Sequence, residues 1–207
     1  MNVKAIPTGP FQEICYIVWS KEQQAIVIDP GFDADLISNH LNDCNLTVAA
    51  YACTHAHADH INALAELHKK YPAPIVMHTN DQAWAFEEIN QIEPYYSVPK
   101  RPDSDSFLQL ENSKDWHFSG LHFQRIETPG HTPGSCCLLF PESKFLFSGD
   151  TLFKGSCGRT DLPGGNPRQL KESLNKLKQL PDDIRVFPGH GEDTKIGIER
   201  ATNFFMQ

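Results

Sequence analysis

A seven-residue segment rich in histidine most limits what this chain can fold into. Residues 54–60 read Thr-His-Ala-His-Ala-Asp-His, in a chain with 10 histidines among 207 residues. Chance produces a His-x-His-x-Asp-His pattern in only about one or two chains per thousand of this size. Side chains two residues apart in an extended or looping segment point the same way, so His55 and His57 can share one metal ion. Asp59 and His60 are offset and can reach a second position.

The donor types in this segment indicate a catalytic metal site. Imidazole nitrogens together with a carboxylate are the ligand set expected of zinc, iron, manganese or cobalt. The segment lacks a cysteine, and the missing thiolate argues against a structural zinc site.

The residues around the segment predict a strand, a loop, a helix and another strand. Apolar runs indicate strands at Thr47–Cys53 and Pro74–His78, and helical spacing indicates a helix at Ile61–Lys70. This order implies parallel pairing with a crossover, and α/β sheets place ligands at the carboxyl ends of such strands.

The rest of the chain predicts an α/β fold with a β-rich middle. Residues 90–106 are expected to be irregular because they contain three prolines. We expect two sheets packed face to face with helices outside, forming one domain over residues 1–207. The further expected strands are Phe11–Trp19, Gln24–Ile28, Phe107–Leu110, Trp116–Phe118, His122–Ile126, Cys136–Phe140, Lys144–Ser148 and Ile184–Phe187. Pro141–Ser143 is expected to be a hairpin turn, and helices are expected at 33–41, at Pro167–Leu180 and from Thr194.

Three more candidate ligands lie at predicted strand ends beside glycine or proline. They are His131 in Thr-Pro-Gly-His-Thr-Pro-Gly-Ser, Asp150 in Ser-Gly-Asp-Thr and His190 in Pro-Gly-His-Gly. Alone, each could be an ordinary turn residue. Added to the histidine-rich segment, they make five histidines and two aspartates, enough for two metal ions with three private ligands each and one shared carboxylate.

The other histidines and the cysteines lack such surroundings. We expect surface or core roles for the five histidines His40, His68, His78, His117 and His122. No pair of the six cysteines forms Cys-x-x-Cys, so we expect buried free thiols, with Cys157, near the predicted site, left open to another role.

Composition limits the partners and the location. The hydrophobic fraction is 40%, the charged fraction is 21% and the net charge is −8. Basic residues are scattered and no apolar run is long enough to span a bilayer, so we expect neither nucleic acid nor a membrane as partner. The amino-terminal residues match neither a secretory nor a mitochondrial presequence, which makes a cytoplasmic location the expectation.

These motifs, in this order, resemble the metallo-β-lactamase superfamily and, within it, the short bacterial type of the glyoxalase II-like (hydroxyacylglutathione hydrolase) branch. The resemblance also includes Val27–Gly31 and Gly155–Arg159. It implies an α/β fold, the αβ/βα four-layer sandwich with two mixed sheets flanked by helices. It also implies a first metal ion on His55, His57 and His131, a second on Asp59, His60 and His190, and Asp150 bridging both.

The implied activity is metal-dependent hydrolysis of thioesters, for example glutathione-linked ones. Two divalent ions, zinc above all but also iron or manganese, would share a water and hold it as a hydroxide nucleophile. Asp59 and Asp150 are then the catalytic carboxylates. Asp29 is either a partner of a ligand histidine or a turn carboxylate before Pro-Gly.

The substrate part of the resemblance is looser. Arg159 matches a basic residue that contacts glutathione in the glyoxalase II family, whereas Asp161 stands where that family has an aromatic residue. We expect no counterpart here of the family's helical carboxyl-terminal substrate domain. The Gly-Arg-Thr-Asp loop is also similar to that of persulfide dioxygenases, which use one iron. A mononuclear iron glutathione-persulfide dioxygenase and a non-catalytic metal-binding module are therefore the alternatives.

Overall fold

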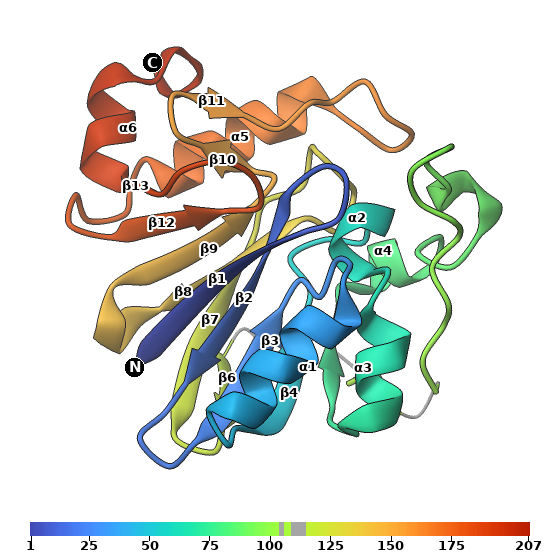
Figure 1. The fold of residues 1–207 in the computed structure, drawn as a ribbon. Coiled ribbons are helices and arrows are strands. Elements are labelled where there is room, and N and C mark those ends of the chain that lie inside the picture. The colour runs from blue at the N-terminus through green and yellow to red at the C-terminus, as the bar shows by residue number, and fades with distance from the viewer. Residues whose placement is uncertain (104–105, 109–114) are drawn as a thin grey trace.

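Two β-sheets packed face to face form the centre of the molecule (Figure 1). The computed structural model describes residues 1–103, 106–108 and 115–207. The first sheet has the order β1 (Asn2–Thr8), β2 (Glu13–Trp19), β3 (Gln24–Ile28), β4 (Thr47–Ala52) and β5 (Ile75–Val76). The second has the order β13 (Thr194–Lys195), β12 (Arg185–Pro188), β9 (Phe145–Gly149), β8 (Cys136–Phe140), β7 (Leu121–Glu127) and β6 (Asp115–Phe118). Both sheets are mixed, because β3, β4 and β5 pair in parallel, as do β9 and β12, while the other neighbours are antiparallel.

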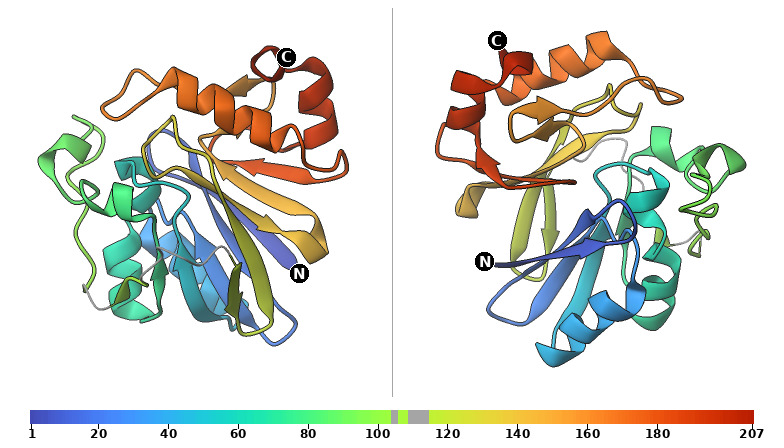
Figure 2. Two further views of the ribbon diagram at one scale, coloured as in Figure 1. Left: turned by 180° about the vertical axis from the view of Figure 1, so that it is seen from behind. Right: turned by 45° about the horizontal axis from the view of Figure 1, so that its top comes forward.

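Helices cover the outer face of each sheet, as Figure 2 shows from two further sides. The first sheet carries α1 (Ala34–Asp43) and α3 (Leu64–Lys70), and the second carries α5 (Pro167–Leu177) and α6 (Ile196–Thr202). The remaining elements are α2 (Ala58–Ile61), α4 (Thr79–Gln82), the small hairpin β10 (Leu152–Phe153) and β11 (Ser156–Cys157), and 3-10 turns at Glu88–Asn90, Pro141–Ser143 and Phe204–Met206. The predicted four-layer sandwich is confirmed. Among the described residues, no helix combines the length and the apolar character needed to cross a membrane.

The alternation of side chains along the strands divides the core into three apolar layers. In β2, Ile17 packs toward the helices of its own sheet, whereas Tyr16 and Val18 pack against the second sheet. In β8, Leu138 faces the first sheet and Cys137 faces the layer under α5 and α6. Because the side-chain period of a strand is two, strands with consecutive apolar residues can be buried on both faces.

Several local predictions were wrong. The strand expected at Phe11 begins at Glu13, and β1 was not expected at all. The single helix expected over 61–70 is two helices, because the amide of Ala63 donates to the carbonyls of Pro30 and Gly31, at 3.1 and 3.0 Å, and this interrupts the helical ladder. The helix expected from Thr194 begins at Ile196, after the two-residue strand β13.

A predicted turn in the middle of the chain is confirmed. The Pro141–Ser143 turn joins β8 to β9, as predicted. Of the strand expected at Phe107–Leu110, residues 109–110 lie outside the described residues, and Phe107 forms a parallel bridge with Ile75.

Candidate metal centre

The predicted ligands come together at one edge of the sandwich, where strands of both sheets end. The segment 54–60 follows β4, and His131 follows β7. Asp150 follows β9 and His190 follows β12. All four strands run toward this edge, so chain segments up to about 135 residues apart meet there.

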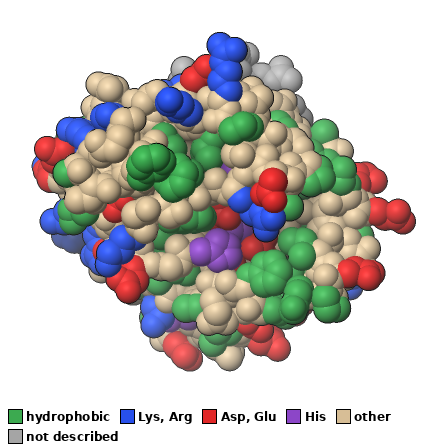
Figure 3. Space-filling view, turned by 90° about the horizontal axis from the view of Figure 1, so that it is seen from above, with side chains coloured by type: hydrophobic (Ala, Val, Ile, Leu, Met, Phe, Trp, Pro, Cys, Tyr) green, Lys and Arg blue, Asp and Glu red, His purple; other side chains and the backbone are tan. Residues whose placement is uncertain are grey.

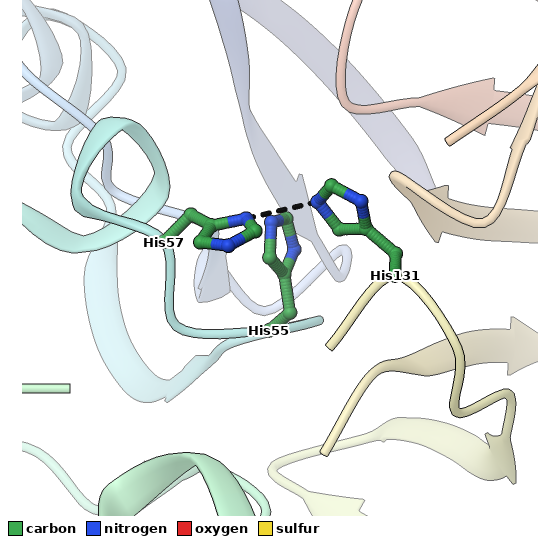
Figure 4. A group of neighbouring side chains, drawn as sticks. All are labelled: His55, His57 and His131. Carbon is green, nitrogen blue, oxygen red and sulfur yellow. Dashed lines mark hydrogen bonds between the residues drawn. The ribbon is translucent and has the colours of Figure 1, made fainter. Parts of the chain in front are cut away.

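His55, His57 and His131 form a first cluster, here called the three-histidine group. One ring nitrogen from each lies within 4.8 Å of the others, and all three residues are buried. Figure 4 shows the rings converging, with 2.9 Å between His57 Nδ1 and His131 Nε2. Burial and the neighbouring histidines lower the pKa of His57 to about 3 and that of His55 well below its usual value. Both imidazoles are therefore neutral at physiological pH, and a neutral imidazole offers a lone pair to a metal.

Asp59, His60 and His190 form a second cluster, here called the Asp59 group, which also meets the 4.8 Å limit. Asp59 Oδ2 lies 3.4 Å from His190 Nε2 and 4.0 Å from His60 Nε2. Asp59 and His60 belong to α2 rather than to an extended segment.

Asp150 lies between the two groups. Its Oδ2 is 3.5 Å from His131 Nε2 and 3.8 Å from His190 Nε2. Its Oδ1 is 3.4 Å from His60 Nε2. One carboxylate thus faces donors of both groups, which is the arrangement that a bridging ligand requires.

The charges around the Asp59 group favour a cation. Burial is the largest single influence on Asp59 and Asp150 and opposes their ionisation, but His60 and the other nearby histidines together outweigh it and lower the pKa of both carboxyls. Burial likewise opposes a charge on His60, but Asp150 and Asp59 raise its pKa well above the usual value. Positive charge is therefore stabilised where a metal ion would bind.

Buried atoms without partners point to the same place. His55 Nε2, His60 Nε2 and Asp150 Oδ1 are buried and make no hydrogen bond. Leaving a buried polar atom unsatisfied costs about 1–3 kcal/mol, and metal ions bound at the two donor groups would satisfy all three. The residues therefore fit divalent ions.

Three of the candidate ligand histidines are held through their Nδ1 atom by an oxygen of a residue distant in the sequence. His60 Nδ1 lies 3.1 Å from Asp29 Oδ2, so Asp29 is the histidine partner that was one of its two predicted roles. His131 Nδ1 lies 2.7 Å from the carbonyl of Arg159, and His190 Nδ1 lies 3.2 Å from that of Phe11. Such contacts fix the ring orientation and leave Nε2 facing the site.

Arg159 reaches the site through its backbone. Its guanidinium makes two hydrogen bonds to Asp161, of 2.7 and 2.6 Å, and its side chain is 62% exposed. The structure thus places the predicted substrate residue beside the site, with its positive charge already paired.

Two buried carboxyls that the sequence did not single out support the ligands. Asp81 accepts hydrogen bonds from the amides of Ala56 and Gly134 and from the Thr132 hydroxyl, and so joins the two ligand loops. Glu13 is fully buried, with Oε1 3.7 Å from His60 Nδ1. Both lack a local motif, and their partners lie far along the chain.

The position of Gly189, beside the candidate ligand His190, requires a glycine. A Cβ on Gly189 would lie 2.3 Å from Asp150 Oδ1 and 2.6 Å from His60 Cε1. This close approach agrees with the expectation that glycines flank the ligands. The five other histidines lie outside both groups, and all six cysteines are free thiols, with Cys157 half-buried.

The model of the metallo-beta-lactamase superfamily matches residues 8–190. The chain belongs to this superfamily. Among its relatives is the hydroxyacylglutathione hydrolase GloC of Haemophilus influenzae, which is 33% identical over all of this chain and 98% of the relative.

Several solved structures are similar over almost the whole chain. The BLEG-1 B3 metallo-beta-lactamase has a TM-score of 0.91 at 35% identity, covering 99% of both chains. TTHA1623 in a di-iron-bound form has a TM-score of 0.85 at 35% identity, covering 98% of this chain and 99% of the other. ETHE1 from Myxococcus xanthus has a TM-score of 0.79 at 28% identity, covering 99% and 84%.

Proposed function

We propose that this protein is a dinuclear metal-dependent hydrolase of thioesters, similar to hydroxyacylglutathione hydrolase. The observation that carries the proposal is Asp150, whose carboxylate lies within 3.8 Å of histidine donors from both groups. A site for one ion would not need a carboxylate between two complete sets of three donors. GloC supports the substrate class.

The three-histidine group would hold one divalent ion and the Asp59 group the other, with zinc as the first choice. The di-iron form of TTHA1623 keeps iron as a second choice. Two bound ions supply an activated water nucleophile and electrostatic stabilisation of the charge that develops on the carbonyl oxygen.

The chain's own catalytic contribution comes from carboxylates. Asp59 and Asp150 stay ionised because their pKa values are lowered. Asp59 Oδ2 lies 3.4 Å from His190 Nε2, at the exposed side of the centre, where it can orient an attacking water by accepting a hydrogen bond from it. None of this needs a nucleophilic side chain.

The direct test is hydrolysis of S-D-lactoylglutathione by metal-loaded protein before and after chelation. We expect turnover that chelation abolishes and that returned metal restores. An Asp150→Ala variant should keep the circular dichroism of the folded protein and lose activity, which excludes a non-catalytic metal-binding module. Metal-loaded protein that opens β-lactams but cleaves no thioester would contradict the proposal.

The similarity to ETHE1 favours one alternative, a mononuclear iron dioxygenase acting on glutathione persulfide. Metal analysis of protein purified without added metal separates the two functions. About two ions per chain support the hydrolase. One iron per chain, together with oxygen uptake on glutathione persulfide, would establish the alternative.

A further inference from the structure

Aromatic side chains surround the candidate metal centre. Figure 3 views the molecule from above and shows a histidine near the middle, recessed between acidic side chains and a group of hydrophobic ones. Four aromatic residues from four separate segments lie around the centre, each exposed or partly exposed, and together they are called the aromatic collar: Phe11, Trp84, Tyr95 and Phe153.

Two members of the aromatic collar contact metal-ligand candidates directly. The centroid of the Trp84 ring lies 5.6 Å from that of His57, and the centroid of the Phe153 ring lies 6.3 Å from that of His190. These contacts place one aromatic ring beside each of the two donor groups.

The other two members form an exposed pair held against the centre. The Phe11 carbonyl lies 3.2 Å from His190 Nδ1, and the Phe11 amide donates a hydrogen bond to the hydroxyl of buried Tyr96. The ring centroids of Phe11 and Tyr95 lie 5.1 Å apart. Phe11 is 39% exposed and Tyr95 is 52% exposed. Large apolar side chains that stay exposed beside a centre of charged and polar donors mark a binding surface.

We propose that the aromatic collar binds the acyl group of the substrate, and that the preferred substrates are thioesters of apolar acyl groups. This inference rests on the proposed thioesterase function. Thiol carriers are polar molecules, so the hydrocarbon part of a thioester is its acyl side. Charge agrees with this choice, because the Arg159 guanidinium is already paired with Asp161 and a substrate carboxylate would have to displace that partner.

The experiment uses metal-loaded protein and a series of S-acyl-N-acetylcysteamines, whose thiol is uncharged and constant. We expect kcat/KM to rise about two- to fourfold for each methylene added from acetyl to hexanoyl. Phe11→Ala and Tyr95→Ala should flatten this rise. Phe204→Ala removes an aromatic ring that is 80% exposed at the carboxyl-terminal turn and contacts Phe205, and should leave the rise unchanged.

Binding decides independently of turnover. S-alkyl-N-acetylcysteamines, which are thioethers and cannot be cleaved, are titrated into metal-loaded protein by calorimetry. Their alkyl chains have the same lengths as the acyl chains of the thioester series. Affinity that rises with alkyl chain length, and that falls in the Phe11 and Tyr95 variants, supports the aromatic collar as a binding site. If the same protein cleaves no thioester, only the proposed function is overturned. Affinity and kcat/KM that are both independent of chain length would overturn the inference and leave the thioesterase standing.

Discussion

Replacing Asp81 by alanine should destabilise the protein, and by an amount that depends on pH. The buried carboxyl accepts hydrogen bonds from the amide of Ala56 at 3.1 Å, the amide of Gly134 at 2.6 Å and the hydroxyl of Thr132 at 2.7 Å. Ala56 lies between two candidate ligands, and the other two donors lie one and three residues after His131. The substitution therefore disconnects the two loops that form the three-histidine group.

The size of the effect follows from two opposing contributions. The Thr132 hydroxyl keeps a second partner in Ser135 Oγ, at 2.8 Å. The buried amides of Ala56 and Gly134 lose the Asp81 carboxyl as acceptor, which costs about 4 kcal/mol in all. Against this, burial raises the pKa of Asp81 from 3.8 to about 6, so ionising it in the folded state costs about 3 kcal/mol at neutral pH. The wild-type protein thus loses stability as pH rises from about 4 through 6.

We therefore expect Asp81→Ala to lower the free energy of unfolding by about 3 kcal/mol at pH 4.5 but only about 1 kcal/mol at pH 7.5. Urea unfolding of metal-free protein in chelator, followed by circular dichroism, measures both values. Asp183→Ala, which removes an exposed carboxylate paired with Lys144, is the matched control and should change little. A difference that is the same at both pH values would refute the reasoning about Asp81.

Asp150→Asn should lower thioesterase activity at least about a hundredfold and reduce the metal content to one ion or fewer; full occupancy by two ions would contradict a bridging role. Gly189→Ala should also lose metal, because its Cβ would meet Asp150, and metal analysis of the folded variant tests this. Asp161→Asn frees Arg159 and should lower KM for S-D-lactoylglutathione about threefold without changing kcat; an unchanged KM would argue against any contact with the anionic thiol carrier. Dialysis from pH 8 to pH 5 should release the ion of the Asp59 group first, because the raised pKa of His60 lets protons compete there; simultaneous loss of both ions would exclude this order.

The sequence could predict the donors because each one is marked locally. Four of the seven lie in one segment of seven residues, and His131, Asp150 and His190 stand beside glycine or proline at strand ends. The sandwich was predictable for a similar reason, since consecutive apolar residues such as those of β8 can serve two core layers only when a strand is buried on both faces.

The supporting residues could not be predicted, because their roles exist only in three dimensions. Asp81 stands in the polar run Thr-Asn-Asp-Gln, which is typical of an exposed turn, and is buried only because the two ligand loops close over it. Glu13 opens a strand, and its neighbour His60 is 47 residues away. The strand β1 is mostly exposed and held by its ladder with β2, so it lacks the alternation that identifies a buried strand.

The start of α2 explains how one segment can serve two metal groups. His57 has extended backbone, with φ −60° and ψ 147°, whereas Asp59 and His60 lie within the helix. In a fully extended segment Asp59 would project on the same side as His55 and His57, since the side-chain period is two. A helix instead turns each successive residue by about 100°, which carries Asp59 away from His55 and His57 and toward His190. The His60 ring stays near both groups, with its centroid 4.0 Å from that of His55 and 5.4 Å from that of His190. The short helix that the sequence pattern merged with α3 therefore directs Asp59 to the second set of donors, and Asp150 reaches both sets because they start from a single segment.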